Sequence, residues 1–230
     1  MTGGGQSMEL YEAFRGTFAA RHFTDDPVSD ETVARLLEEA RFAPSGGNRQ
    51  GWRVVVVRSP ETRAALEPLM LPTMQRYVAE QRAGMSPWNP LEPSPVSAET
   101  CAATEVPDAL LAPLRTAPVL LFLFLDLGKV AAMDQHLKRV GVISGASIYP
   151  FAWNILLAAH AEGLGGTLTT FLAPEERAVA ELLEVPENYA FAAMIPLGVP
   201  SKRLTKLRRN PVSSFATVER FTGPALPEAP

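Results

Sequence analysis

Three stretches of consecutive apolar residues, rich in β-branched side chains, predict the strands of a sheet. The run WRVVVVR at residues 52–58 follows a turn of Pro, Ser, Gly and Asn residues, and it is expected to be a buried strand. Residues 118–126 are apolar up to their last position, which predicts a central strand covered on both faces. Residues 190–199 form a third apolar run and are expected to be a further buried strand.

Apolar residues at helical spacing predict helices between these strands. In residues 29–42, Val33, Leu36 and Ala40 share one face, and Ser29 can cap the first turn. Further helices are expected over residues 8–18, from Ser59 onward, over 146–162 and from about Pro174. The segment 146–162 is apolar nearly all round, which predicts a helix buried in the molecule or at a subunit interface. Strands that alternate with helices favour a layered α/β or α+β domain with one mixed sheet.

Residues 72–96 are expected to form a long irregular loop. Prolines at positions 72, 87, 90, 93 and 95 argue against a long helix there. A loop of this length in a compact domain is usually a lid, a binding loop or disordered.

Composition narrows the class of protein. The chain has 230 residues and a net charge of −4, so one large domain is expected, without the basic surface that nucleic-acid binding needs. Its single cysteine, Cys101, excludes an internal disulfide. The longest apolar run, residues 117–127, is too short to cross a membrane, and the first residues do not resemble a signal peptide. We therefore expect a cytoplasmic protein that binds neither membrane nor nucleic acid.

Motifs for chemistry carried out by protein side chains alone are missing. The three histidines, His22, His136 and His160, have no metal-ligand spacing, so no metal site is predicted. The segment GVISG at 141–145 places its serine one position too late for a hydrolase nucleophile elbow. The segment GLGGTL at 163–168 follows a predicted helix and lacks the last glycine of a dinucleotide-binding turn. These absences favour a bound cofactor as the source of the chemistry.

Four separated segments resemble the FMN-dependent nitroreductase family. They are FRGTFAARHFTDDPV (14–28), APSGGNRQGWRVVVV (43–57), SGASIYPFAWNILLAAHAEGLGGTLTTFL (144–172) and LTKLRRNPV (204–212). They occur in the family's order and cover the chain from about residue 8 to 222. The resemblance implies an α+β three-layer sandwich, with a central mixed sheet between helices, as a single domain over 8–222 with flexible termini at 1–7 and 223–230. It also implies a homodimer with two FMN sites at its interface, in which residues 212–221 cross to the partner as an edge strand.

The resemblance also implies a set of residues that bind FMN. Arginine forks suit a phosphate, so Arg21 and Arg209 are expected to hold it, with Arg208 and Lys206 as helpers. The alternative for this basic tail is a solvated surface segment. The full predicted set is Phe18, Ala19, Arg21, Pro44, Ser45, Gly46, Gly47, Asn48, Gln50, Thr169, Thr170, Lys206, Arg208 and Arg209. The turn 44–50 would let backbone approach the flavin ring, although Asn48 and Gln50 could equally brace the turn itself.

Three positions depart from the family pattern. Phe18 stands where an arginine is common, His22 replaces another arginine, and Gly51 replaces the usual proline. The change at position 18 removes an expected phosphate partner. Ala19 stands where related flavin-cleaving enzymes have an aspartate, which argues against that chemistry.

The implied function is an oxidoreductase that uses FMN to pass electrons from NAD(P)H to a small organic acceptor, such as a nitroaromatic or a quinone, by a ping-pong mechanism. No protein acid or base is required, so no catalytic residue is assigned. The loop 72–96 would roof the acceptor pocket with Met74, Tyr77, Met85 and Trp88; the alternative is a surface excursion packed on the partner subunit. Two other functions stay open: a flavin-binding protein that stores FMN without turnover, and a redox enzyme that uses a deazaflavin.

Overall fold

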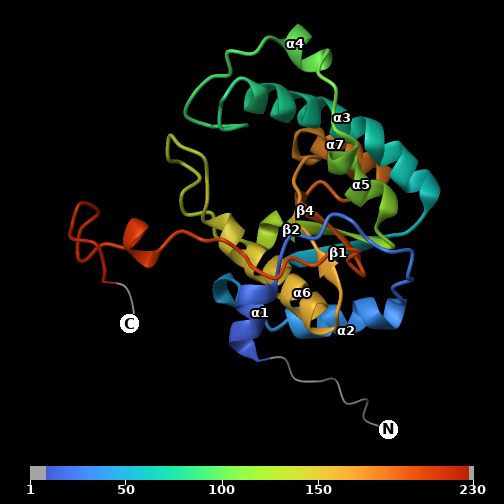
Figure 1. The fold of residues 1–230 in the computed structure, drawn as a ribbon, viewed down its shortest axis with the longest axis horizontal. Helices are drawn as coiled ribbons and strands as arrows, with labels where there is room; N and C mark the ends of the chain where they lie inside the picture. The colour runs from blue at the N-terminus through green and yellow to red at the C-terminus, as the bar shows by residue number, and fades with distance from the viewer. Residues whose placement is uncertain (1–8, 228–230) are drawn as a thin grey trace.

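A four-stranded antiparallel sheet forms the centre of the protein in the computed structural model, which describes residues 9–227. The strands β1 (Trp52–Val57), β2 (Val119–Asp126), β4 (Tyr189–Gly198) and β3 (Gly165–Gly166) lie in that order across the sheet. Figure 1 labels the three longer strands at the centre of the molecule. The residues 1–7 and 228–230 of the predicted flexible termini lie outside the described range, and the predicted domain boundaries stay a prediction.

The expectation of a mixed sheet was wrong. Each pair of neighbouring strands is antiparallel, and in residues 9–227 parallel pairing occurs only as an isolated bridge between Ala19 and Gly166. Strands that alternate with helices are often joined by parallel crossovers, which would make a sheet mixed. Here the helices between β1 and β2 bring the chain back to the end of the sheet where it left, so β2 runs against β1.

Helices cover both faces of the sheet, which confirms the layered arrangement. On one face, α2 (Asp30–Ala40) and α6 (Tyr149–Ala161) pack on Val119, Leu121 and Leu123. On the other face, α3 (Pro60–Arg82), α5 (Asp108–Thr116) and α7 (Glu176–Leu182) pack on the alternate residues of β2, including Phe122 and Phe124. The short helices α1 (Leu10–Gly16) and α4 (Ala98–Ala102) lie at the two outer sides (Figure 1). As predicted, β2 is central and buried on both faces.

The strand β1 is less buried than its sequence predicted. It pairs only with β2 in the described residues, and its side chains are half-buried or exposed as far as Val56, which is 41% exposed. An unbroken valine run indicates apolar surroundings on both faces, but it does not distinguish a central strand from an edge strand. Among the described residues β1 is an edge strand, so within that range one row of its backbone N–H and C=O groups has no strand beside it.

The predicted loop over 72–96 begins with helix. The helix α3 extends to Arg82 and contains both Pro68 and Pro72, so the expectation of irregular structure from residue 72 was wrong. Proline inside a helix costs about 3 kcal/mol or more because it removes a hydrogen bond and crowds the preceding turn. Burial of Leu66, Met70 and Met74 along one face of α3 offsets that cost. Only residues 83–97 form the irregular connection to α4.

The cap of α2 agrees with its prediction, and α6 is buried on one side only. Ser29 caps α2 by accepting a hydrogen bond from the Thr32 N–H, as predicted. The helix α6 buries one side in the core but leaves Tyr149 and Trp153 exposed to about 44% and 42% in the single chain. In the single chain, Val212–Ser214 forms a 3-10 turn and Thr217 makes an isolated bridge to Ala225, so the expected pairing of residues 212–221 with a partner's sheet stays a prediction. This tail extends away from the body of the molecule (Figure 1).

Among residues 9–227, no helix has both the length and the apolar character needed to cross a membrane.

Candidate functional site

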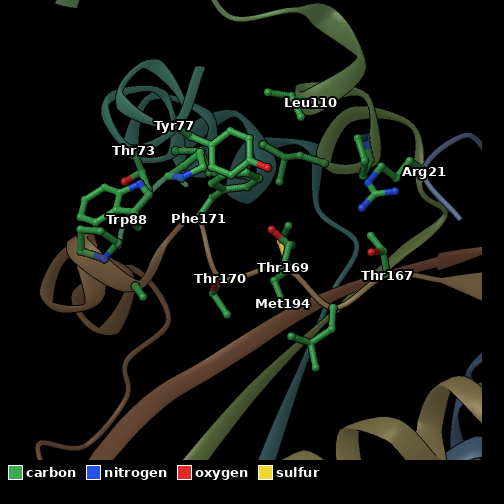
Figure 2. Close-up of a pocket in the computed structure, with 17 residues that line it drawn as sticks. Arg21, Thr73, Tyr77, Trp88, Leu110, Thr167, Thr169, Thr170, Phe171 and Met194 are labelled. Carbon is green, nitrogen blue, oxygen red and sulfur yellow. The ribbon is translucent and has the colours of Figure 1, made fainter. Parts of the chain in front are cut away.

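A cavity of about 480 Å³ lies between α3, α5 and the loop 167–174; we call it the inner cavity. Figure 2 shows Arg21 and Thr167 at one end and Trp88 with Thr73 at the other. Its walls are mostly apolar or aromatic and include Met70, Tyr77, Leu110, Leu114, Phe171 and Met194. Such a lining suits a flat organic molecule better than a strongly hydrated one.

The loop 167–170 supplies the polar groups at the floor of the inner cavity. The N–H and C=O of Thr169 pair with the backbone of Met194, at 3.0 and 2.9 Å, so β4 fixes the loop. The Oγ1 of Thr169 is buried and has no hydrogen-bond partner within residues 9–227. A buried hydroxyl without a partner costs about 1–3 kcal/mol. A ligand in the inner cavity could satisfy this hydroxyl, and the exposed Thr170 lines the same cavity.

A second cavity, the arginine cavity, adjoins the first and measures about 550 Å³. The Ala20 N–H donates to the Gly166 carbonyl at 2.9 Å. This bond places the segment 14–28 beside the glycine-rich segment 163–168. Both Arg21 and Arg209 line this cavity, although 188 positions of sequence separate them. Arg21 also lines the inner cavity, so the two spaces meet at its side chain.

The two arginines are available to bind an anion. Within residues 9–227, neither forms an ion pair with a carboxylate. Arg21 donates a long 3.5 Å hydrogen bond to the Ala19 carbonyl, and Arg209 donates to the Arg208 carbonyl at 2.7 Å. Each guanidinium therefore keeps unused donors. The predicted helpers Lys206 and Arg208 line neither cavity.

The segment 14–28 lines the arginine cavity with buried side chains and with backbone. Phe18 is only 9% exposed, and Ala19 lies beside it in the bridge to Gly166. Phe18 thus contributes an apolar wall at the position where the family pattern commonly has an arginine.

The turn 44–50 lies apart from both cavities in the single chain. The Ser45 hydroxyl accepts from the Gln50 N–H at 3.0 Å, and the Gln50 amide donates to the Asn48 side-chain oxygen at 3.1 Å. Gly47, Asn48 and Gln50 all have positive φ angles, which these bonds help to hold. These bonds brace the turn, which is the alternative role that the sequence left open for Asn48 and Gln50. Pro44, Ser45, Gly46, Gly47, Asn48 and Gln50 line neither the inner nor the arginine cavity.

Two of the four predicted roof residues lie at the inner cavity and two do not. Tyr77 and Trp88 line it, and Tyr77 contacts Phe171 edge-on, with ring centroids 5.4 Å apart. Met74 is fully buried in the core beneath α3, because the chain is helical there rather than looped. Met85 does not line the cavity either.

A buried carboxylate that the sequence did not indicate, Glu80, lies close to Trp88. Its side chain is 2% exposed and accepts hydrogen bonds from the Arg76 Nε and from the backbone N–H of Trp88, both at 2.7 Å. Burial alone would raise the pKa of Glu80, but the bonds from Trp88 and Arg76 outweigh burial and hold this pKa below its ordinary value. Glu80 is therefore ionised at neutral pH. A single glutamate in a polar stretch carries no sequence signal for such a role.

Comparison with known proteins identifies relatives over most of the chain. The family model described as the nitroreductase family matches residues 15–199. A 5,6-dimethylbenzimidazole synthase of Rhodospirillum rubrum is 33% identical over an alignment of 190 residues that covers 78% of this chain and 76% of that protein. A nitrobenzene nitroreductase of Ectopseudomonas oleovorans is 30% identical over 200 residues, covering 81% and 85% of the two chains.

The fold also matches a solved structure. The structure of oxidized iodotyrosine deiodinase bound to FMN and 3-iodo-L-tyrosine superposes with a TM-score of 0.64 and 21% identity, over 93% of this chain and 99% of that one.

Proposed function

This chain belongs to the nitroreductase family of oxidoreductases, and we propose that it uses FMN to pass electrons from NAD(P)H to a small organic acceptor, such as a nitroaromatic or a quinone. The observation that carries the proposal is the meeting of Arg21 and Arg209 at one cavity beside the loop 166–168. Two arginines from opposite ends of a chain with net negative charge, without carboxylate partners in residues 9–227, are suited to a phosphate.

The residues present fit FMN. Arg21 and Arg209 would donate to the phosphate, since a guanidinium fork matches its oxygens. The unpartnered Thr169 hydroxyl and the backbone of 167–170 would contact the ring from the floor of the inner cavity. When bound, FMN would supply the redox chemistry by accepting a hydride and reducing a second substrate. The chain itself would bind and orient the reactants and limit the access of water.

The inner cavity fits the acceptor. Arg21 is the charged residue among its lining residues, and Tyr77, Trp88 and Phe171 offer aromatic faces. A flat, uncharged aromatic acceptor would gain contact area there without leaving a charge unpaired. We propose that NAD(P)H and the acceptor use this space in turn, which requires a ping-pong order.

We further propose a cytoplasmic homodimer with sites completed across its interface. The single chain exposes large apolar side chains on α1, on α6 and in the tail, including Tyr11 at 72%, Trp153 at 42% and Phe221 at 98%. Monomeric proteins rarely leave so much apolar surface uncovered. The turn 44–50 lies outside both cavities, so it would reach a flavin only from a second copy. The tail 212–221 would then pair with the partner's sheet.

One named relative has a different activity, the synthesis of 5,6-dimethylbenzimidazole. In the nitroreductase pattern, related flavin-cleaving enzymes have an aspartate at the position that Ala19 holds in this chain. An alanine has no group to hold or move a proton at that place. We therefore propose the reductase activity rather than flavin cleavage.

The purified protein tests the proposal directly. We expect a yellow protein whose released cofactor has the mass of FMN, and whose flavin colour is lost on anaerobic addition of NADH or NADPH and returns with a quinone. Flavin that neither nicotinamide reduces would contradict the proposal and favour a storage protein. A bound deazaflavin would contradict the cofactor assignment.

A further inference from the structure

A third cavity adjoins the inner cavity behind Trp88. This outer cavity measures about 460 Å³ and lies between α3, α4 and residues 86–97. Thr73, Trp88 and Pro174 line both spaces. The indole of Trp88 therefore stands between the two cavities, at the end of the inner cavity opposite Arg21 (Figure 2).

Trp88 is held in place by two contacts that do not depend on a ligand. The buried Glu80 carboxylate accepts its backbone N–H at 2.7 Å. The Arg76 guanidinium lies over its ring, 4.0 Å from the centroid. A cation over an aromatic face contributes roughly 0.5–2 kcal/mol. Trp88 also has a φ of +57°, which a bulky residue rarely adopts unless its surroundings enforce it.

Arg76 and Glu80 act as a unit in this arrangement. They are one helical turn apart on α3, and the Arg76 Nε donates to the Glu80 carboxylate at 2.7 Å. The segment 83–97 has no regular structure of its own, and the backbone of Met85 is also tied to α3 through the Glu80 carbonyl. The placement of the indole is thus set by α3, which is otherwise part of the core.

We propose that Trp88 is the specificity-determining end wall of the acceptor pocket, and that Arg76 and Glu80 are positioning residues that keep it closed. This inference rests on the proposed function, since it takes the inner cavity as the acceptor site. Trp88 in its present position limits the length of the acceptor. If the indole is removed or released, a longer acceptor extends into the outer cavity, whose Gln75, Ser94 and Glu175 offer polar contacts.

The test compares the binding of two quinones of different length to the oxidised, flavin-loaded protein without NAD(P)H. The probes are 1,4-naphthoquinone and 2-anilino-1,4-naphthoquinone, which carries one further ring, and calorimetric titration gives both dissociation constants. We expect Trp88→Ala to shift their ratio at least tenfold toward the longer quinone, or about 1.4 kcal/mol. Trp88→Phe, which keeps a smaller ring, should give a shift in the same direction and of smaller size.

The role of Glu80 is tested through Trp88. Glu80→Gln keeps the shape of the side chain but loses its charge, and it should shift the ratio about threefold in the same direction. In the Trp88→Ala background the same change should add nothing, because coupled residues are not additive. Glu181→Gln removes another Arg–Glu pair at the same i,i+4 spacing, on α7, and it should leave the ratio unchanged. Loss of stability alone would weaken both quinones together and would not move the ratio.

Each outcome decides the matter. A ratio within twofold of the parent in Trp88→Ala and Trp88→Phe would overturn the end-wall assignment, as would a parent protein that binds neither quinone. An equal effect of Glu80→Gln with and without Trp88 would overturn the positioning role. If the ratio shifts as expected but no nicotinamide reduces the flavin, the proposed function fails and the assignment of Trp88 stands.

Discussion

Replacing Arg21 or Arg209 by alanine should weaken the binding of FMN and leave the binding of riboflavin nearly unchanged. The two ligands differ only in the phosphate, so the comparison isolates the group that the arginines are proposed to hold. Arg21 lies where the two cavities meet, and Arg209 reaches the arginine cavity from the C-terminal segment.

The magnitude follows from the contacts that each arginine makes. Neither is paired with a carboxylate in residues 9–227, so its removal leaves no buried anion behind. The loss is then that of hydrogen bonds to a charged ligand, about 1.5–3 kcal/mol for each side chain. At about 1.4 kcal/mol per tenfold, the dissociation constant of FMN should rise roughly ten- to a hundredfold.

Quenching of flavin fluorescence during titration of the apoprotein measures both constants. Arg177→Ala provides the control, because Arg177 is an exposed arginine on α7, paired with Glu181, that lines neither cavity. If Arg21→Ala and Arg209→Ala both leave the FMN constant within twofold of the parent, the phosphate assignment is refuted. Equal weakening of FMN and riboflavin would likewise point to a general distortion of the cavity instead of a phosphate contact.

Three further predictions concern assembly, kinetics and the core. Light scattering at micromolar concentration should give the mass of a dimer, and deletion of residues 211–230 should lower flavin occupancy; a monomer, or unchanged occupancy, would contradict the shared interface. Steady-state rates with NAD(P)H and a quinone should give parallel double-reciprocal lines, because both substrates use one cavity in turn. Lines that intersect over a wide concentration range would reject this shared cavity. Met74→Ala should destabilise the protein by about 2–5 kcal/mol in denaturant unfolding, without changing the preference between quinones, since Met74 is core rather than roof.

Elements with a strong local signal could be predicted from the sequence. The helix α2 carries both a cap at Ser29 and an apolar face, and the apolar residues on both faces of β2 predicted that it is covered on both sides. The helix α3 was misjudged because Pro68 and Pro72 weigh against helix locally. Residues Leu66, Met70 and Met74 recur every fourth position, and this spacing was the signal that tertiary burial would prevail.

The candidate site contains residues that the sequence could indicate and one that it could not. Arg21, Thr169 and Arg209 could be predicted as candidates because each lies in a recognisable motif, and the fold brings them to two adjoining cavities. Glu80 was not found, because its role depends on the backbone N–H of a residue eight positions away. No side-chain pattern records where a backbone donor will point. The exposed edge of β1 escaped notice for a related reason, since strand order depends on chain connections and not on composition.

The antiparallel pairing of β2 with β4 has a consequence for synthesis of the chain. On the ribosome β2 can pair with β1 early, but its other edge has no partner until residues 127–198 have been added. At about 5–20 residues per second, this takes roughly 4–14 seconds. During that interval a strand of eight residues, seven of them apolar, has one edge uncovered in the nascent chain. We expect the yield of folded protein to depend on chaperones that shield such segments, and slower translation across α6 should increase that dependence.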